Sequence, residues 1–292
     1  MTIVVLLLAF ALVYFVRDLS RLHRFEWVKH ATAFCNRHCR QLPGWDGITG
    51  FLFYLLLPLL MTALIAMLAH QVLGTLGGFL LAVAVLVYTF GPHDLDTDID
   101  AIIHADSDGD QAAAMRALLG DCPSDDGDCM ALAIEGVFRE SLQRWFGTIF
   151  WFAVLGIYGA ILYRMADRIT EPDLDLPTGQ RALLMRLRQV LDWPVAQLMT
   201  LALAIATDFD SVLKAWRQYH QEQGHGLFDG NNDFLYAAAR QIVLSGQAAR
   251  DGYADQITGP MACLRQAMDL VWRMLGVWLT VLALLLLIDL LA

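Results

Sequence analysis

Polar and ionisable side chains flank an apolar segment, residues 145–164, whose length matches the hydrocarbon core of a membrane. The candidates for a ligand pocket are Glu135, Arg139, Tyr163, Arg164, Asp167 and Asp192. An arginine in this setting can recognise a phosphate or carboxylate through paired hydrogen bonds, and neighbouring carboxylates can act as acids or bases. Each residue taken alone could equally be an interfacial anchor or a salt-bridge partner. We therefore predict a polar pocket only if the elements that carry these side chains meet.

Other kinds of catalytic or metal site find little support in the sequence. It contains no Walker loop, no dinucleotide fingerprint and no GxSxG elbow, so the commonest nucleotide-driven and hydrolytic mechanisms are excluded. The aspartates between residues 94 and 110 lack the glycine and glutamate spacing of an EF-hand, and we expect a solvated acidic loop that caps a helix. His30, Cys35, His38 and Cys39 lack a distant second pair of ligands, so we predict no metal and no cofactor.

The composition is that of a membrane protein. The chain of 292 residues is 57% hydrophobic, which exceeds the apolar share of ordinary soluble domains. Its net charge of −10 argues against nucleic acid as a partner, because phosphates require clustered lysine and arginine. Its five cysteines are odd in number and irregular in spacing, and we expect reduced thiols rather than a disulfide framework. The lipid bilayer is the partner that the composition predicts.

Several apolar runs can be assigned to the bilayer. Residues 49–69 and 72–91 are each long enough to cross, and the polar, glycine-containing residues between and after them predict a helical hairpin. Residues 3–16 predict a thin or tilted first span, and residues 275–292 predict a last one. Residues 194–207 form a short apolar run, typical of a core or re-entrant element.

The distribution of basic residues then constrains the topology. Arginine and lysine cluster in residues 17–48 and again in residues 164–274, so both regions are predicted to be cytoplasmic. The hairpin places the acidic residues 92–147 on the same side. A single full crossing at residues 148–163 contradicts this arrangement. Either this segment dips into the membrane and returns, which we favour, or residues 194–207 cross back.

Small residues support the dip, because they allow helices to approach closely. The predicted helix-packing residues are Gly156, Gly159 and Ala160. Residues 181–193 have an amphipathic, arginine-containing pattern that predicts an interfacial helix. Helical patterns also cover residues 110–119, 130–144, 211–222 and 233–249, and no strand pattern or internal repeat is visible.

We therefore predict an all-α fold, a polytopic α-helical integral membrane protein with amphipathic and cytoplasmic helices. Its predicted parts are membrane spans with a basic cytoplasmic loop (1–91, the loop being 17–48), an acidic cytoplasmic loop and helix (92–147), a glycine-broken membrane segment with an interfacial helix and a short apolar run (148–207), a helical soluble region (208–274) and a C-terminal span (275–292).

Several motifs of this sequence resemble the AmpE family of bacterial inner-membrane proteins. The matching residues are Glu135, Phe150-Trp151, Gly156-x-x-Gly159-Ala160-x-x-Tyr163-Arg164 and Pro194-x-Ala196-x-Leu198. The resemblance implies a multi-pass protein of the inner membrane that modulates β-lactamase induction as a sensor in cell-wall recycling. It further implies a ligand or a partner protein from that process, and it leaves the oligomeric state open.

The AmpE family is itself related to the CbiB/CobD cobalamin synthases, which join an amino alcohol or its phosphate to a corrinoid carboxylate. Their pattern before the glycine-rich element is approximately Glu-x-x-x-Glu-Asn-x-x-Asp, of which this sequence keeps Glu135. The other three positions hold Arg139, Glu140 and Gln143. Tyr163 and Arg164 match the synthases, but the polar residues that follow differ. The resemblance thus favours a non-catalytic modulator, with a membrane transferase or ligase acting on a phosphorylated or carboxylated substrate as the alternative.

Overall fold

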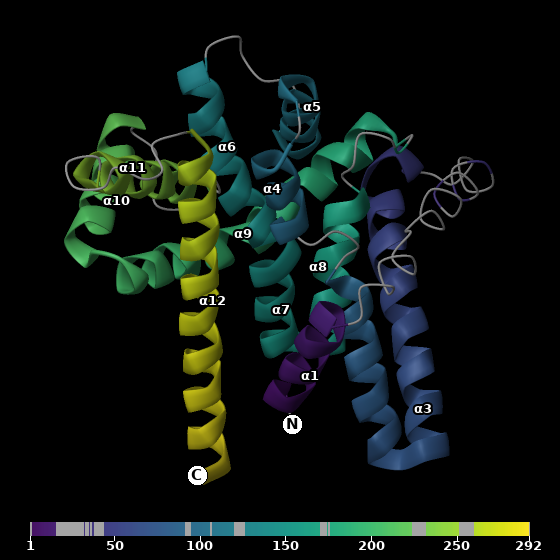
Figure 1. Cartoon of the computed structure of the whole chain (residues 1–292). Helices are drawn as coiled ribbons and strands as arrows, with labels where there is room; N and C mark the ends of the chain where they lie inside the picture. Colours follow the sequence, from purple (N-terminus) through teal and green to yellow (C-terminus); the bar gives the residue numbers. More distant parts are fainter. Residues whose placement is uncertain are drawn as a thin grey trace. The chain divides into compact units, whose positions relative to one another are not determined.

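The computed structural model describes residues 2–15, 32, 35, 37, 44–90, 95–105, 107–119, 126–169, 174, 176–223, 232–250 and 260–291. The chain divides into two compact units. The first unit comprises Met1–Pro92 and Gly147–Asp192, and the second comprises His93–Phe146 and Trp193–Ala292. Across the described residues every regular element is a helix, which confirms the predicted all-α class (Figure 1).

Among the described residues, three helices are long and apolar enough to cross a membrane. They are Trp45–Thr89, Thr178–Ala206 and Met261–Leu285. The first of them exposes large apolar side chains along most of its length, among them Leu60 at 65% and Val72 at 79%. Exposed apolar surface on this scale is stable only against another apolar phase, so the protein is an all-α membrane protein.

The first unit begins with α1 (Thr2–Phe15), followed by a π-helical turn η2 (Trp45–Thr49) and the long helix α3 (Gly50–Thr89). Helix α3 folds back at Gly74, whose φ of 60° and ψ of −140° belong to glycine. Its two arms run side by side in Figure 1. A Cβ at Gly77 would lie 2.2 Å from the carbonyl oxygen of Ala69, so only glycine fits at the start of the second arm, just after the turn. This is the hairpin that the apolar runs predicted.

A second helical hairpin follows at the glycine-broken segment. Helices α7 (Gly147–Leu155) and α8 (Ile157–Ile169) pack against each other and are separated by Gly156, whose φ is +64°. A Cβ at Gly159 would lie 2.1 Å from the Trp151 carbonyl oxygen, and Ala160 is fully buried. The backbone therefore returns on itself at the predicted small residues instead of continuing as one straight helix.

Helix α9 (Thr178–Ala206) corrects one expectation. The sequence suggested an interfacial helix ending near residue 193 and a separate apolar run, but the structure has one helix of 29 residues that contains Pro194. Proline removes one backbone donor and bends a helix, yet the helix can continue when neighbours satisfy the local carbonyls. The carbonyl that Pro194 leaves without its helical donor is that of Val190, and the Trp151 Nε1 donates to the neighbouring carbonyl oxygen, that of Leu191, at 3.1 Å. The boundary between the two units falls within α9, next to this proline.

The second unit is a bundle of helices around α6. Its elements are α4 (Leu95–Ile103), α5 (Asp108–Leu119), α6 (Asp126–Ser141), the π-helical turn η3 (Leu142–Phe146), α10 (Phe209–Gln223), α11 (Asp233–Arg250) and α12 (Pro260–Leu291), together with the last part of α9. Helix α6 packs against α11 and α12, and α10 packs against α11.

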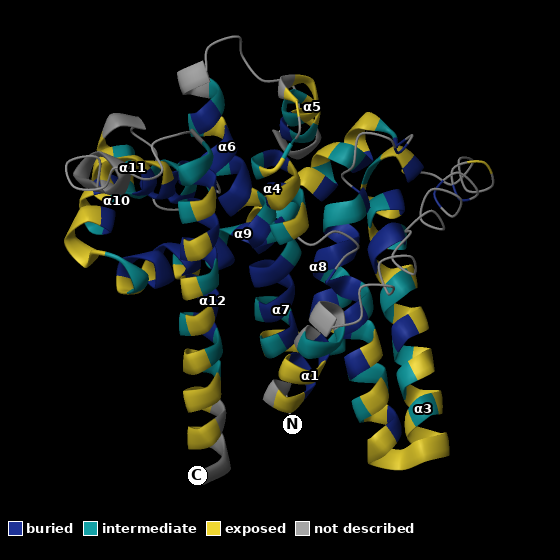
Figure 2. Ribbon diagram, viewed as in Figure 1, coloured by how far each residue is buried: buried dark blue, intermediate teal, exposed yellow. Residues whose placement is uncertain are grey.

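Helix α12 begins well before the predicted start of the last span. Its residues up to Trp278 pack through apolar side chains at helical spacing, including Leu264, Val271 and Trp278, and these are buried. Its second half exposes Leu284, Leu285 and Ile288 (Figure 2). Arginines within the first half interrupt the apolar pattern, so the uninterrupted apolar run starts later than the helix does.

The acidic region is another correction. The aspartates near residue 98 lie on helix α4 rather than in a loop, because Leu95, Ile99 and Ile102 are spaced to bury one helical face. Cys129 is disulfide-bonded, which departs from the expectation of reduced thiols, whereas Cys35 and Cys263 form no disulfide, as expected. Of the cysteine–histidine group near residue 35, only Cys35 is described, and the rest of that group lies outside the described residues. Within the described ranges, no group of three potential metal ligands occurs.

Candidate functional site

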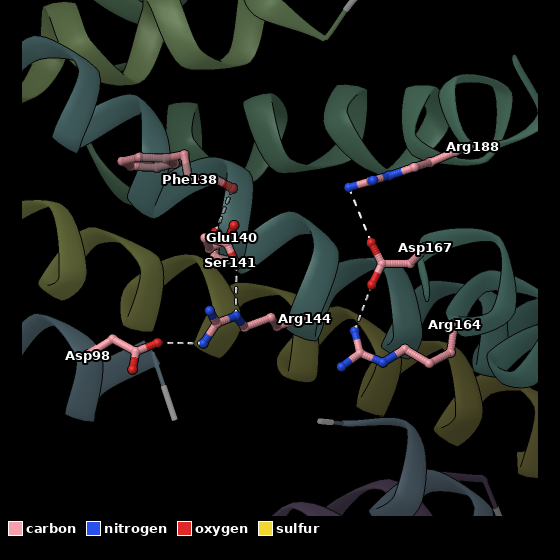
Figure 3. A network of polar contacts seen from close by, with 8 residues as sticks. All are labelled: Asp98, Phe138, Glu140, Ser141, Arg144, Arg164, Asp167 and Arg188. Atoms are coloured by element: carbon pink, nitrogen blue, oxygen red, sulfur yellow. Dashed lines mark hydrogen bonds and ion pairs between the residues drawn. The ribbon is translucent and has the colours of Figure 1, made fainter. Parts of the chain in front are cut away.

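The first unit contains a buried polar cluster made by α8 and α9. Tyr163 Oη donates a hydrogen bond of 2.7 Å to Asp192 Oδ1. Asp192 Oδ2 lies 3.7 Å from Arg188 Nε, and Arg188 in turn contacts Asp167 Oδ1 at 3.2 Å. Asp167 Oδ2 accepts a hydrogen bond of 3.0 Å from Arg164 (Figure 3). We call these five residues the arginine–aspartate cluster.

Burial and charge distinguish the cluster from ordinary surface pairs. The Arg164 side chain is 3% exposed, Asp192 is 7% exposed and Asp167 is 14% exposed. Two guanidinium groups face two carboxylates, so the formal charges balance. Charges removed from water in this way are stable only when they are paired and hydrogen-bonded. The α8 and α9 helices are therefore fixed relative to each other by polar contacts as well as by the apolar contacts around Ile169 and Leu184.

A glycine that the sequence did not single out makes room for the cluster. A Cβ at Gly147 would lie 2.1 Å from Tyr163 Cζ and 2.3 Å from Tyr163 Oη. The first residue of α7 must therefore be glycine for the Tyr163 ring to reach Asp192. Tyr163 is 1% exposed, so its ring has little space in which to move.

The sequence-predicted residues divide between the two units. Tyr163, Arg164, Asp167 and Asp192 come together in the first unit, and Arg188 joins them. Sequence reasoning missed Arg188 as a site residue because it was interpreted as part of a lipid-facing helix. The available signal was its i,i+4 spacing from Asp192, which places both on one helical face.

Glu135 and Arg139 lie on α6, in the second unit. Glu135 Oε1 forms a salt bridge of 2.9 Å with Arg240 on α11, whereas Arg139 is exposed. Burial raises the pKa of the Glu135 carboxyl above its ordinary value, and the charge of Arg240 opposes that shift. The predicted meeting of Glu135 with the residues of the first unit stays a prediction.

The second unit has a polar network of its own. Arg144 in η3 contacts Glu140 at 2.8 Å and Asp98 on α4 at 2.7 Å (Figure 3). Burial acts to lower the pKa of Arg144, but the two carboxylates outweigh it and hold the pKa above its ordinary value. This network ties α4 to the end of α6, where the helix changes from α to π geometry. Short π-helical turns are frequent near functional sites.

Fold and cluster together define a class of protein: an all-α membrane protein with a glycine-turned helical hairpin that carries a buried, charge-balanced arginine–aspartate cluster. Residues 6–169 match the CobD/Cbib protein family, and because this is more than half of the chain, the chain belongs to that family. The matched region includes the α3 hairpin, α7 and all of α8, with three residues of the cluster.

One curated relative is the cobalamin biosynthesis protein CobD of Stutzerimonas stutzeri (strain A1501). It is 30% identical over 169 residues, which cover 51% of this chain and 52% of the relative. The chain thus spans about half the length of the relative that it matches. No solved structure matches the chain significantly. The relationship to the CbiB/CobD synthases is confirmed, whereas the finer AmpE assignment has no support from these comparisons.

Proposed function

We propose that the protein is a membrane-bound transferase or ligase built on the CobD/CbiB scaffold, acting on a phosphorylated or carboxylated substrate. Family membership supports this, as does a relative whose name places it in cobalamin biosynthesis. The observation that carries the proposal is the position of Arg164, a guanidinium that is 3% exposed, lies in the family-matched segment and shares the Asp167 carboxylate with Arg188. This pair of arginines is suited to holding one anionic group.

The proposed role of each side chain follows from the contacts. Asp167 lies between Arg164 and Arg188, so this pair of arginines already binds one carboxylate, which supports a role in binding an anionic substrate group. Asp192 accepts a hydrogen bond from the Tyr163 hydroxyl and lies within reach of Arg188. Asp192 and Tyr163 are therefore the candidates for proton transfer. In this mechanism the arginines bind and orient the substrate, while the surrounding apolar side chains exclude water.

The test is complementation of a cobalamin-auxotrophic strain that lacks its own CobD/CbiB-type enzyme. We expect the wild-type chain to restore growth on a corrinoid precursor and Arg188→Ala to fail. Arg186→Ala is the matched control, because Arg186 lies two residues away on α9 and is exposed. If the wild-type chain fails to restore growth while it is present in the membrane, the proposed reaction is refuted.

A second candidate is the modulator function, favoured by one specific observation. Both carboxylates of the cluster lie within reach of an arginine, and Glu135 is bridged to Arg240, so the acidic groups have the arrangement of structural ion pairs. This is the pattern expected of a non-catalytic relative. In that case the protein is a multi-pass inner-membrane modulator of β-lactamase induction that responds to a ligand or partner from cell-wall recycling.

The two candidates differ in their genetic effects. For the modulator, deletion of the gene changes inducible β-lactamase activity, and complementation by Arg164→Ala or Glu135→Ala fails to restore the wild-type response. Unchanged induction in the deletion strain refutes this candidate and leaves the transferase proposal to its own test.

A further inference from the structure

The first unit contains an apolar groove between the two arms of α3 and helix α8. Its cavity volume is about 490 Å³, within the usual range of small-ligand pockets. Leu57, Met61 and Ile65 line it from the first arm, Leu81 and Ala84 line it from the second, and Arg164 lines it from α8. We call it the α3 groove.

The groove has one charged lining residue in an otherwise almost wholly apolar wall. Among its lining residues, Arg164 alone carries a charge. The hydroxyls of Thr62 and Thr89 donate to the carbonyl oxygens of Pro58 and Leu86 within their own helix, so they add little polarity. Because the arms are antiparallel and turn at Gly74, Thr89 lies at the open end of the hairpin, and Leu81 and Ile65 lie nearer its tip.

The two arms of α3 give the groove its apolar length. From Leu57 to Ile65 the first arm rises roughly 12 Å, at the α-helical rise per residue. The arms carry exposed apolar side chains, with Met61 at 53% and Ile65 at 47% exposed, which suits them to lipid rather than water. A hydrocarbon chain fits the apolar length, and an anion fits the arginine. A guanidinium has five N–H donors, enough to contact more than one anionic group at a time.

We propose that the α3 groove binds one acyl chain of an anionic membrane phospholipid, with Arg164 binding the phosphate of its headgroup. This rests on the proposed recognition of an anionic group by Arg164 and extends it by naming an amphiphile as the ligand. The charge complementarity and the apolar lining argue for a phospholipid over a second copy of the chain, which would bring no anion to Arg164.

The experiment is native mass spectrometry of the delipidated, detergent-solubilised full chain, titrated with dioleoyl phosphatidylglycerol or dioleoyl phosphatidylcholine. We expect one phosphatidylglycerol per chain, bound at least tenfold more tightly than phosphatidylcholine. Ala84→Trp, which fills the groove, should weaken binding at least tenfold. Leu60→Trp, on the opposite face of the first arm, should bind as the wild type does. Ile65→Trp fills the groove from the other arm and serves where Ala84→Trp does not fold.

Each further outcome has a defined meaning. Arg164→Gln should abolish the preference for phosphatidylglycerol while some binding of both lipids persists. Equal binding by the wild type and by both folded groove-filling variants would overturn the proposal, as would a groove-dependent dimer peak without bound lipid. A parallel titration with inorganic phosphate separates the two proposals. Phosphate binding that needs Arg164, combined with phosphatidylglycerol binding that is unchanged by the tryptophan substitutions, supports the anion site and refutes the lipid groove. If the wild type binds neither phosphate nor phosphatidylglycerol, anion recognition itself is refuted.

Discussion

Gly147→Ala tests whether close packing at the start of α7 holds the Tyr163 hydroxyl on Asp192. The new Cβ would lie 2.1 Å from Tyr163 Cζ. The ring must therefore recede by roughly 1.4 Å to regain an ordinary carbon–carbon contact. Tyr163 Oη is 2.7 Å from Asp192 Oδ1, so a displacement of this size away from the carboxylate breaks the hydrogen bond.

Two costs add to the loss of stability. Overpacking of a buried site costs about 1–3 kcal/mol, and a buried hydrogen-bonding group left without its partner costs about 1–3 kcal/mol. Alanine in place of glycine returns at most about 1 kcal/mol through helix propensity. We therefore expect Gly147→Ala to lower the free energy of unfolding by roughly 2 kcal/mol or more, as measured by denaturant titration in detergent micelles.

Gly276→Ala is the matched control, because a Cβ at Gly276 on α12 meets nothing within 4 Å. A double-mutant cycle with Tyr163→Phe isolates the hydrogen bond. In the phenylalanine background, Gly147→Ala should cost only the overpacking. The reasoning is refuted if Gly147→Ala is as stable as Gly276→Ala, or if its cost is the same with and without the Tyr163 hydroxyl.

Three further predictions concern charge, capping and backbone geometry. Asp167→Asn removes the carboxylate that Arg164 and Arg188 share and should destabilise the protein by about 3–5 kcal/mol, measured as a lowered Tm in detergent. The double variant with Arg164→Gln should recover part of that loss. An unchanged Tm in the single variant would contradict a structural ion pair. The hydrogen bonds that Asp208 accepts from Ser211, in the first turn of α10, lower the pKa of the Asp208 carboxyl. The contribution of Asp208 to stability is therefore present above the ordinary aspartate pKa and is lost as the pH falls through the folded-state pKa. Asp208→Ala should abolish this pH dependence of helix content, as measured by circular dichroism. Gly74→Ala forces a side chain into a backbone conformation reserved for glycine and should cost about 1–3 kcal/mol, whereas Gly78→Ala, which has open space, should be close to neutral by the same unfolding measurement.

The length and placement of apolar runs in the sequence determine much of this fold. A run long enough to cross a bilayer must form a helix, since backbone groups find no water there, and a glycine near its middle allows it to turn. The α3 hairpin follows from this reasoning, as does the break at Gly156. Helices next to arginines are harder to delimit, because α9 and α12 continue through charged residues and, in α9, through Pro194.

In the candidate site, too, some contacts follow from the sequence and others depend on the tertiary structure. Spacing within a helix predicts neighbours, so the pairs Arg164–Asp167 and Arg188–Asp192 are accessible from the sequence. The contacts of Asp167 with Arg188, of Tyr163 with Asp192 and of Gly147 with the Tyr163 ring join different helices. Only the tertiary structure decides these contacts, because they depend on how α7, α8 and the first part of α9 pack, and residue spacing along one helix carries no information about the rotation of its neighbour.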